Sequence, residues 1–197
     1  MVNPDELTAS LEEDGLVVGG GRGGVKALIE FEDWDVTAGT VSFWITPEDW
    51  NTSLAFLFGA VDEEQGHFRC DVGRHGIRCF GYGTDPGRTW NRIGSAKAES
   101  FEELQPGEWR HVALVWEKDK FVTAYLDGKE CRLRRKGFPW PDAFSTLWIG
   151  STHPRHTART RVKDFRAYSR PLMPGEIAAL AGKTMKFAAE TQANVTP

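Results

Sequence analysis

Short segments that alternate between apolar and polar residues recur along this chain, and they restrict the folds it can adopt. About ten such segments occur, rich in β-branched and aromatic residues and bounded by Gly, Pro or Asp. In TVSFWIT, alternation places Val41, Phe43 and Ile45 on one face of a strand and Trp44 on the other. Helical periodicity is almost absent. The sequence therefore predicts an all-β fold, an antiparallel two-sheet sandwich.

One pair of segments predicts its own register. In HFRCDVGRHGIRCFGYG, two alternating runs flank a hairpin turn centred on Arg74 and His75. This turn places Cys70 opposite Cys79 at a non-hydrogen-bonded pair, where Cα atoms approach to about 4.5 Å. Either a disulfide or two small core thiols fits that geometry. The chain has three cysteines, and the odd number favours the thiols.

Other stretches depart from simple strands. Residues 84–106 are too long for a hairpin connection, and we expect a loop there. The Asp127-Gly128 pair predicts a second hairpin turn. Near the end, PGEIAALAG predicts a short helix, with Pro174 in its first turn and Gly182 at its end.

The length of 197 residues suits one domain, predicted over residues 25–182 between a flexible lead-in (1–24) and a frayed tail (183–197). The net charge of −4 argues against a nucleic-acid partner. No stretch approaches the roughly 18 apolar residues of a membrane span. The acidic N-terminus lacks the features of a signal peptide. We expect a soluble protein without membrane insertion, and its compartment stays open.

Four segments in order resemble a known family: GTVSFWITP, PGEWRHVALVWEKDKFVTAYLDGKE, LWIGS and VKDFRAYSRPLMPGEIAAL. They are similar to the laminin-G-like jelly rolls of the concanavalin A-like lectin/glucanase superfamily, over roughly residues 25–181. The resemblance implies a jelly-roll sandwich whose closing strand is followed by one helical turn. It also implies that Ile177 and Leu180 of that turn pack on a sheet, and it favours an extracellular or surface-exposed location.

The same resemblance implies a lectin-like, non-catalytic module that binds a carbohydrate or a glycoconjugate. The alternative is a structural or protein-interaction domain, for instance in a surface or virion assembly. Some relatives are glycoside hydrolases, which need closely spaced carboxylates. In the nearest match here, IEFEDWDV, Glu30 and Glu32 share a face, but Trp34 stands where the next acid is needed. We therefore expect no enzyme, and a divergent glycoside hydrolase is the less favoured alternative.

Many relatives bind a structural calcium ion through an acidic residue of the closing strand. Aligned on that motif, Lys163 falls on the first acidic position and Asp164 on the second. An ammonium group cannot ligate Ca²⁺, which requires oxygen ligands. We expect no tightly bound calcium and no cofactor.

Cations cluster on two segments, CRLRRKG and RTRVK. In each segment, alternate cations leave the same side of an extended chain. Together they would form a stripe that holds sulfates or carboxylates, because Arg binds such groups bidentately. An equally weighted alternative is a scattered soluble surface. The predicted stripe consists of Arg132, Arg134, Lys136, Arg159, Arg161 and Lys163.

Sugars stack their apolar faces on exposed aromatic rings. Trp44 and Trp109 match framework positions of the family, and we expect them to serve packing. The remaining aromatic residues in loop-like or outward-facing sequence are the better ligand candidates. These candidates are Tyr82, Trp90, Trp140 and Trp148, with Trp50 as a further possibility.

Overall fold

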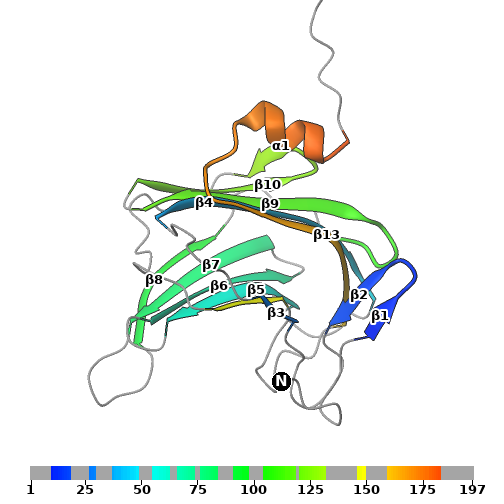
Figure 1. Cartoon of the computed structure of the whole chain (residues 1–197), viewed down its shortest axis with the longest axis horizontal. Helices are drawn as coiled ribbons and strands as arrows, with labels where there is room; N and C mark the ends of the chain where they lie inside the picture. The colour runs from blue at the N-terminus through cyan, green and yellow to red at the C-terminus, as the bar shows by residue number, and fades with distance from the viewer. Residues whose placement is uncertain are drawn as a thin grey trace, which may run out of the picture.

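The computed structural model of this chain contains two antiparallel sheets that lie face to face, with one short helix outside them (Figure 1). The all-β sandwich predicted from the alternating segments is confirmed. The structure describes residues 10–18, 27–29, 37–48, 55–62, 66–73, 76–83, 91–97, 104–118, 120–131, 146–149 and 159–182.

The larger sheet has seven strands, and its order in space differs strongly from the order in sequence. The last strand of the chain lies inside this sheet, between strands from the N-terminal quarter of the chain. In spatial order the strands are β1 (Ser10–Glu12), β2 (Gly15–Val18), β13 (Thr160–Tyr168), β4 (Ala38–Pro47), β9 (Arg110–Glu117), β10 (Phe121–Leu126) and β11 (Lys129–Cys131).

The smaller sheet has six strands, and four of them follow one another as a meander. The predicted hairpin is confirmed: Gly73 pairs with Gly76, and Cys70 pairs with Cys79. In spatial order the strands are β3 (Ala27–Ile29), β12 (Thr146–Ile149), β5 (Ala55–Asp62), β6 (Gly66–Gly73), β7 (Gly76–Gly83) and β8 (Asn91–Lys97).

The core lies between the two sheets. On β4, Val41, Phe43 and Ile45 are at most 1% exposed, as the alternation predicts. Residues of the six-stranded sheet, including Ile77 and Ile149, belong to the same buried cluster. Burying a large apolar side chain contributes about 1.5–3 kcal/mol, so this layer supplies much of the driving force that holds the sheets together.

A second, smaller cluster lies on the outer face of the seven-stranded sheet, beneath α1 (Pro174–Leu180). Ile177 is fully buried there and Leu180 is partly buried, as the family resemblance implies. The turn between β10 and β11 meets the helix: Gly128 has a φ of +75°, and a Cβ on it would lie 3.0 Å from the Cα of Ala178. Glycine is therefore required here both by the turn and by the close approach.

A buried hydroxyl fixes the chain between β13 and α1. The Thr40 Oγ1 donates to the carbonyl of Arg170 (3.0 Å) and accepts from the N–H of Leu172 (2.9 Å). Thr40 is fully buried, so these two bonds satisfy a group that would otherwise be costly to desolvate. The start of α1 is thereby held on the sheet.

Two expectations from the sequence are wrong. Residues 84–106 do not form one long loop, because β8 pairs with β7 inside that range. At the edge of the sheet, the polar sequence NRIGSAK lacks the apolar alternation of a half-buried strand, which is why the pattern missed it.

The expected flexible lead-in over residues 1–24 is also wrong for residues 10–18, which form β1 and β2. These strands have only three and four residues and carry an acidic turn, so the sequence signal is weak. Val17 and Val18 are at most 2% exposed, and β2 pairs with β13. The tail over residues 183–197 lies outside the described residues.

Candidate functional site

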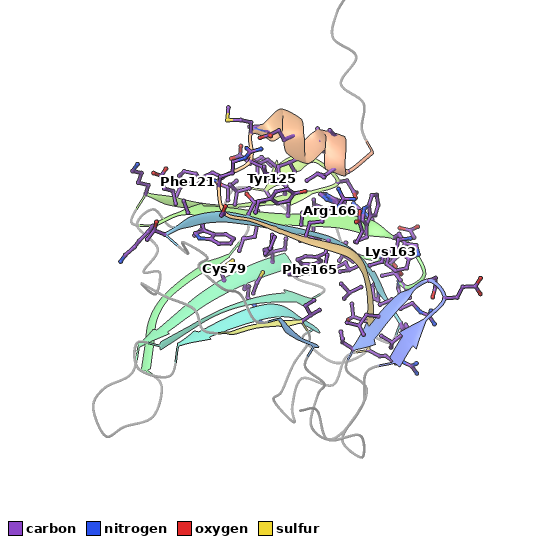
Figure 2. All side chains as sticks on the ribbon, in the orientation of Figure 1. Cys79, Phe121, Tyr125, Lys163, Phe165 and Arg166 are labelled. Atoms are coloured by element: carbon purple, nitrogen blue, oxygen red, sulfur yellow. The ribbon has the colours of Figure 1, made fainter. Side chains whose placement is uncertain are left out.

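Between α1 and the β1–β2 hairpin, the outer face of the seven-stranded sheet carries cations beside tryptophans. We call Trp44, Trp109, Lys163 and Arg166 the cation–aromatic patch. The Lys163 Nζ lies 3.8 Å from the centroid of the Trp109 ring, and Lys163 pairs with Trp44 across β13 and β4. Figure 2 shows Lys163 and Arg166 on the side of the sheet that carries α1. Both tryptophans are partly exposed and both cations are exposed.

A β-bulge in β13 brings the two cations to the same face. Residues 163 and 166 would point to opposite faces of a regular strand, but the β13–β4 register shifts between them. Asp164 lies in the bulge, where β13 has one residue more than β4. Its φ is +51°, a conformation that Asp tolerates better than most residues. Phe165 turns into the core and stacks on Phe43, with ring centroids 5.6 Å apart.

The guanidinium of Arg166 is oriented by its neighbour in the bulge. Its Nε and Nη2 donate to the two carboxylate oxygens of Asp164 at 2.8 and 2.9 Å. The hydrogen bond to Asp164, with a further one to Tyr168, raises the pKa of Arg166. Arg166 is thus permanently charged and held in place on an exposed surface.

Two buried polar residues support Trp44 from β4 and β9. The ring of His111 meets the Trp44 ring edge to face, with centroids 5.4 Å apart, and its Nε2 is hydrogen-bonded to the Ser42 Oγ at 2.8 Å. His111 is 1% exposed and Ser42 is 2% exposed. The backbone N–H of His111 donates to the Asp127 Oδ1 at 3.0 Å, which connects His111 to the β10–β11 turn. These groups position Trp44, and their burial keeps them from reaching a ligand.

The cations predicted at the start of β13 have partners within the protein. Thr160 and Val162 are buried, so the alternating Arg159 and Arg161 point to the opposite, outer face of the strand. However, the Glu48 carboxylate binds both arginines, with Nε–O distances of 2.6 and 2.5 Å.

Arg161 also pairs with Asp14 in the β1–β2 turn. The sequence pattern did not show these partners. Lys163 is the third cation of the segment, and it lies over the indole ring of Trp109. We therefore group it with the cation–aromatic patch and not with the cation stripe.

The other half of the predicted stripe stays a prediction. Arg132, Arg134 and Lys136 lie outside the described residues. The strand that leads into them, β11, is separated from β13 by β10, β9 and β4.

Two of the predicted aromatic candidates lie on strands of the other sheet. Tyr82 lies on β7 and Trp148 on β12, both in the six-stranded sheet. In contrast, Arg161 lies on β13 of the seven-stranded sheet, and Arg159 directly precedes that strand. Trp50, Trp90 and Trp140 lie outside the described residues.

Sequence reasoning assigned Trp44 and Trp109 to packing alone and so missed the patch. The signal was present, because Trp44 alternates with buried Phe43 and Ile45 and must face away from the core. The bulge that adds Arg166 to this face had no such signal.

The two closing-strand positions aligned with the calcium motif, Lys163 and Asp164, both have partners within the protein. The Lys163 ammonium lies over Trp109, and Arg166 binds the Asp164 carboxylate. Within the described ranges, no three His, Cys, Asp or Glu side chains form a group that could hold a metal ion. The acidic stretch from Glu30 to Asp35 lies outside those ranges.

Two facing antiparallel sheets with a helix after the closing strand define a lectin-like β-sandwich. A family model for the concanavalin A-like lectin/glucanases superfamily matches residues 19–178, which is most of the chain. The chain belongs to this superfamily. Comparison with curated proteins gives no match.

Solved structures share the fold at low identity. The receptor-binding domain of botulinum neurotoxin C/D mosaic serotype aligns with a TM-score of 0.64 and 14% identity, covering 90% of this chain and 45% of that one. For the Trypanosoma rangeli sialidase in complex with sialic acid, the TM-score is 0.61 at 17% identity, over 89% of this chain and 28% of that one.

A third structure comes from work on botulinum neurotoxin type C, whose cell entry depends on interaction with two ganglioside molecules. It aligns with a TM-score of 0.63 and 14% identity, covering 90% of this chain and 45% of that one. This chain therefore spans less than half the length of these neighbours. In its described part, no helix is long and apolar enough to cross a membrane.

Proposed function

We propose that this domain is a non-catalytic module that binds carbohydrate, specifically acidic glycans, at the cation–aromatic patch. The observation that carries the proposal is the Lys163 ammonium 3.8 Å above the ring of a partly exposed tryptophan, Trp109. Indole rings offer an apolar face on which a sugar ring stacks, while a nearby cation attracts a carboxylate or sulfate. Arg166, on the same face, adds a second cation of fixed orientation.

The surroundings of the patch favour a glycan over a flat protein interface. Its cations are exposed and its apolar area is limited to two partly exposed rings. In the described part of the chain, Met173 is the large apolar side chain classed as exposed, at 68%, so no broad apolar surface adjoins the patch there. Among the structural neighbours, the sialidase is in complex with sialic acid, and the entry of botulinum neurotoxin type C into cells depends on two ganglioside molecules. Both descriptions are consistent with an acidic sugar as ligand on this fold.

The absence of catalysis is part of the proposal. Ser42 and His111 form a hydrogen-bonded pair that would resemble a nucleophile and its base. At 2% and 1% exposure, neither side chain can reach a glycosidic bond. We therefore expect no release of reducing sugar from polysaccharides, and a positive reducing-sugar assay would contradict this part.

The binding proposal is tested with a sialylated oligosaccharide and its desialylated counterpart, by calorimetry at low and moderate salt. We expect the acidic sugar to bind and to weaken as salt rises, since exposed charges are screened beyond about 8 Å at physiological ionic strength. Lys163→Met should reduce affinity about tenfold, corresponding to roughly 1.4 kcal/mol.

Lys120→Met is the matched control, because Lys120 is exposed but lies at the β9–β10 turn, paired with Glu117. This variant should bind like the parent. Equal binding of both sugars would contradict the acidic preference, and binding of neither would favour the alternative of a protein-interaction domain.

A further inference from the structure

The β6–β7 hairpin holds a second feature, unrelated to the patch. Cys70 and Cys79 are thiols that face each other across the two strands, with their Sγ atoms 4.0 Å apart. We propose that this pair is a site of covalent modification: oxidised glutathione, or another small disulfide, joins the two thiols into a cross-strand disulfide while the chain folds.

The register makes such a bond geometrically accessible. Counting from the Gly73–Gly76 pair next to the turn, Cys70 and Cys79 fall at a non-hydrogen-bonded position. Cα atoms there are about 4.5 Å apart, which lies within the range that disulfides span. To form the bond, the sulfurs must approach from 4.0 Å to about 2.05 Å.

The location of the pair determines when it can react. Cys70 is 1% exposed and Cys79 is fully buried, both within the main core cluster together with Ile77. Thiol–disulfide exchange requires direct attack of one sulfur on another. Once the sandwich has closed, glutathione cannot reach either sulfur, so the oxidation step belongs to the unfolded or partly folded chain.

Each exchange step is balanced. One Cys thiolate attacks oxidised glutathione, forms a mixed disulfide and releases one glutathione thiolate. The thiolate of the second Cys then attacks the protein sulfur of that mixed disulfide and releases the second glutathione. Overall, two protein thiols are oxidised to one disulfide, and one oxidised glutathione is reduced to two thiols.

The third cysteine is not a suitable partner. Cys131 lies on β11 at the edge of the seven-stranded sheet, whereas Cys70 and Cys79 are central to the six-stranded sheet. Its Sγ lies 3.9 Å from the carbonyl oxygen of Lys129, within its own hairpin. The bond we propose therefore joins neighbours on one hairpin and leaves Cys131 as a thiol.

The test is to refold the full chain in a glutathione redox buffer, block remaining thiols with iodoacetamide, and map tryptic peptides by mass. Trypsin separates the two cysteines into peptides 70–74 and 79–88 and places Cys131 in peptide 130–132. We expect the first two peptides to be linked and peptide 130–132 to be alkylated. Alkylation of both Cys70 and Cys79, or a link to Cys131, would overturn the proposal.

Two further measurements examine the consequences of burial and geometry. Native reduced protein given oxidised glutathione should form the bond about tenfold or more slowly than the refolding chain, because the core must first open. The linked protein should melt roughly 5 °C higher than the reduced protein, since the bond restricts the unfolded chain. A lower melting temperature would show that the hairpin does not accommodate the bond.

Cys131→Ala is the matched control and should still form the link, whereas Cys79→Ala should not form it. If Cys79→Ala fails to fold, the peptide map of the parent chain alone decides the question.

Discussion

The two ends of β13 carry similar cations but use them differently. At its start, Arg161 and the preceding Arg159 share the Glu48 carboxylate, and Arg161 also pairs with Asp14. On either side of the bulge at its middle, Lys163 lies over an indole ring and Arg166 is bound by the carboxylate of Asp164 on the outer face. The first group is an ion-pair cluster that connects β13 to the end of β4 and to the β1–β2 hairpin, and the second group is exposed on the outer face of the sheet.

The difference teaches that cation spacing along a strand does not identify a binding site. The acids that neutralise Arg161 are 113 and 147 residues away in the sequence. The Arg161–Glu48 pair is partly buried and should therefore contribute more to stability than an exposed pair, because water replaces a lost charged partner less effectively at a partly buried site.

The largest effect should come from Arg161→Ala. The Arg161 side chain is 23% exposed and its partner Glu48 is 22% exposed. We expect the free energy of unfolding to fall by about 1–3 kcal/mol, measured by urea denaturation. Arg159→Ala, at 45% exposure, is the control and should lose less than about 1 kcal/mol. Equal effects of the two variants would remove the distinction between these arginines.

At the other end of the strand, Arg166→Gln should change function instead of stability. The Arg166–Asp164 pair is about half exposed, so the free energy of unfolding should change by less than about 0.5 kcal/mol. Affinity for a sialylated oligosaccharide should fall about three- to tenfold, as measured by calorimetry. Unchanged affinity together with lost stability would reverse the comparison.

A third arginine pair, Arg170–Glu176, shows how much an exposed ion pair contributes to stability. The Glu176 carboxylate binds both terminal nitrogens of Arg170 and accepts from the backbone N–H of Met173. The hydrogen bond to Arg170, and then that to Met173, lowers the pKa of Glu176 from 4.5 to about 2.

A depressed pKa in the folded state stabilises the protein above the unfolded pKa, and that stabilisation is lost as the pH falls through the folded pKa. The window here runs from about pH 4.5 down to about 2. Glu176→Gln should slightly destabilise the domain at pH 6, and the difference from the parent should shrink through that window. Urea denaturation of both proteins at several pH values measures this, and a difference independent of pH would contradict it.

Calcium should have no effect at all. If the ammonium of Lys163 occupies the place of an acidic ligand, a bound ion has lost one of its expected oxygen ligands. The melting temperature should be the same in EDTA and in millimolar Ca²⁺, because an ion that binds only the folded state would raise it. An increase of several degrees with Ca²⁺ would show that the ion binds despite Lys163.

Local patterns in the sequence predicted much of the fold. The alternation around Phe43, the turn that pairs Cys70 with Cys79, and the helix after Pro174 each depend on neighbouring residues, and each is confirmed. The family resemblance added the sandwich topology and the docking of Ile177 on the sheet.

The remaining features depend on contacts that local patterns do not encode. The bulge at Asp164 changes which face Arg166 occupies, and β8 and β1 are strands because neighbouring strands pair with them. The acidic partners of Arg161 come from elements that are distant in sequence. Side-chain spacing alone therefore placed the cations on one side but assigned them the wrong surroundings.

The central place of β13 in its sheet also constrains how the chain is made. During synthesis, the β1–β2 hairpin leaves the ribosome before the other described strands, and its partner β13 leaves it after them. Neighbouring hairpins of the other sheet, from β5 to β8, can pair soon after they emerge. Until β13 emerges, the edge of β2 (residues 15–18) lacks the strand that pairs with it, and such unpaired edges are prone to misassociation during folding.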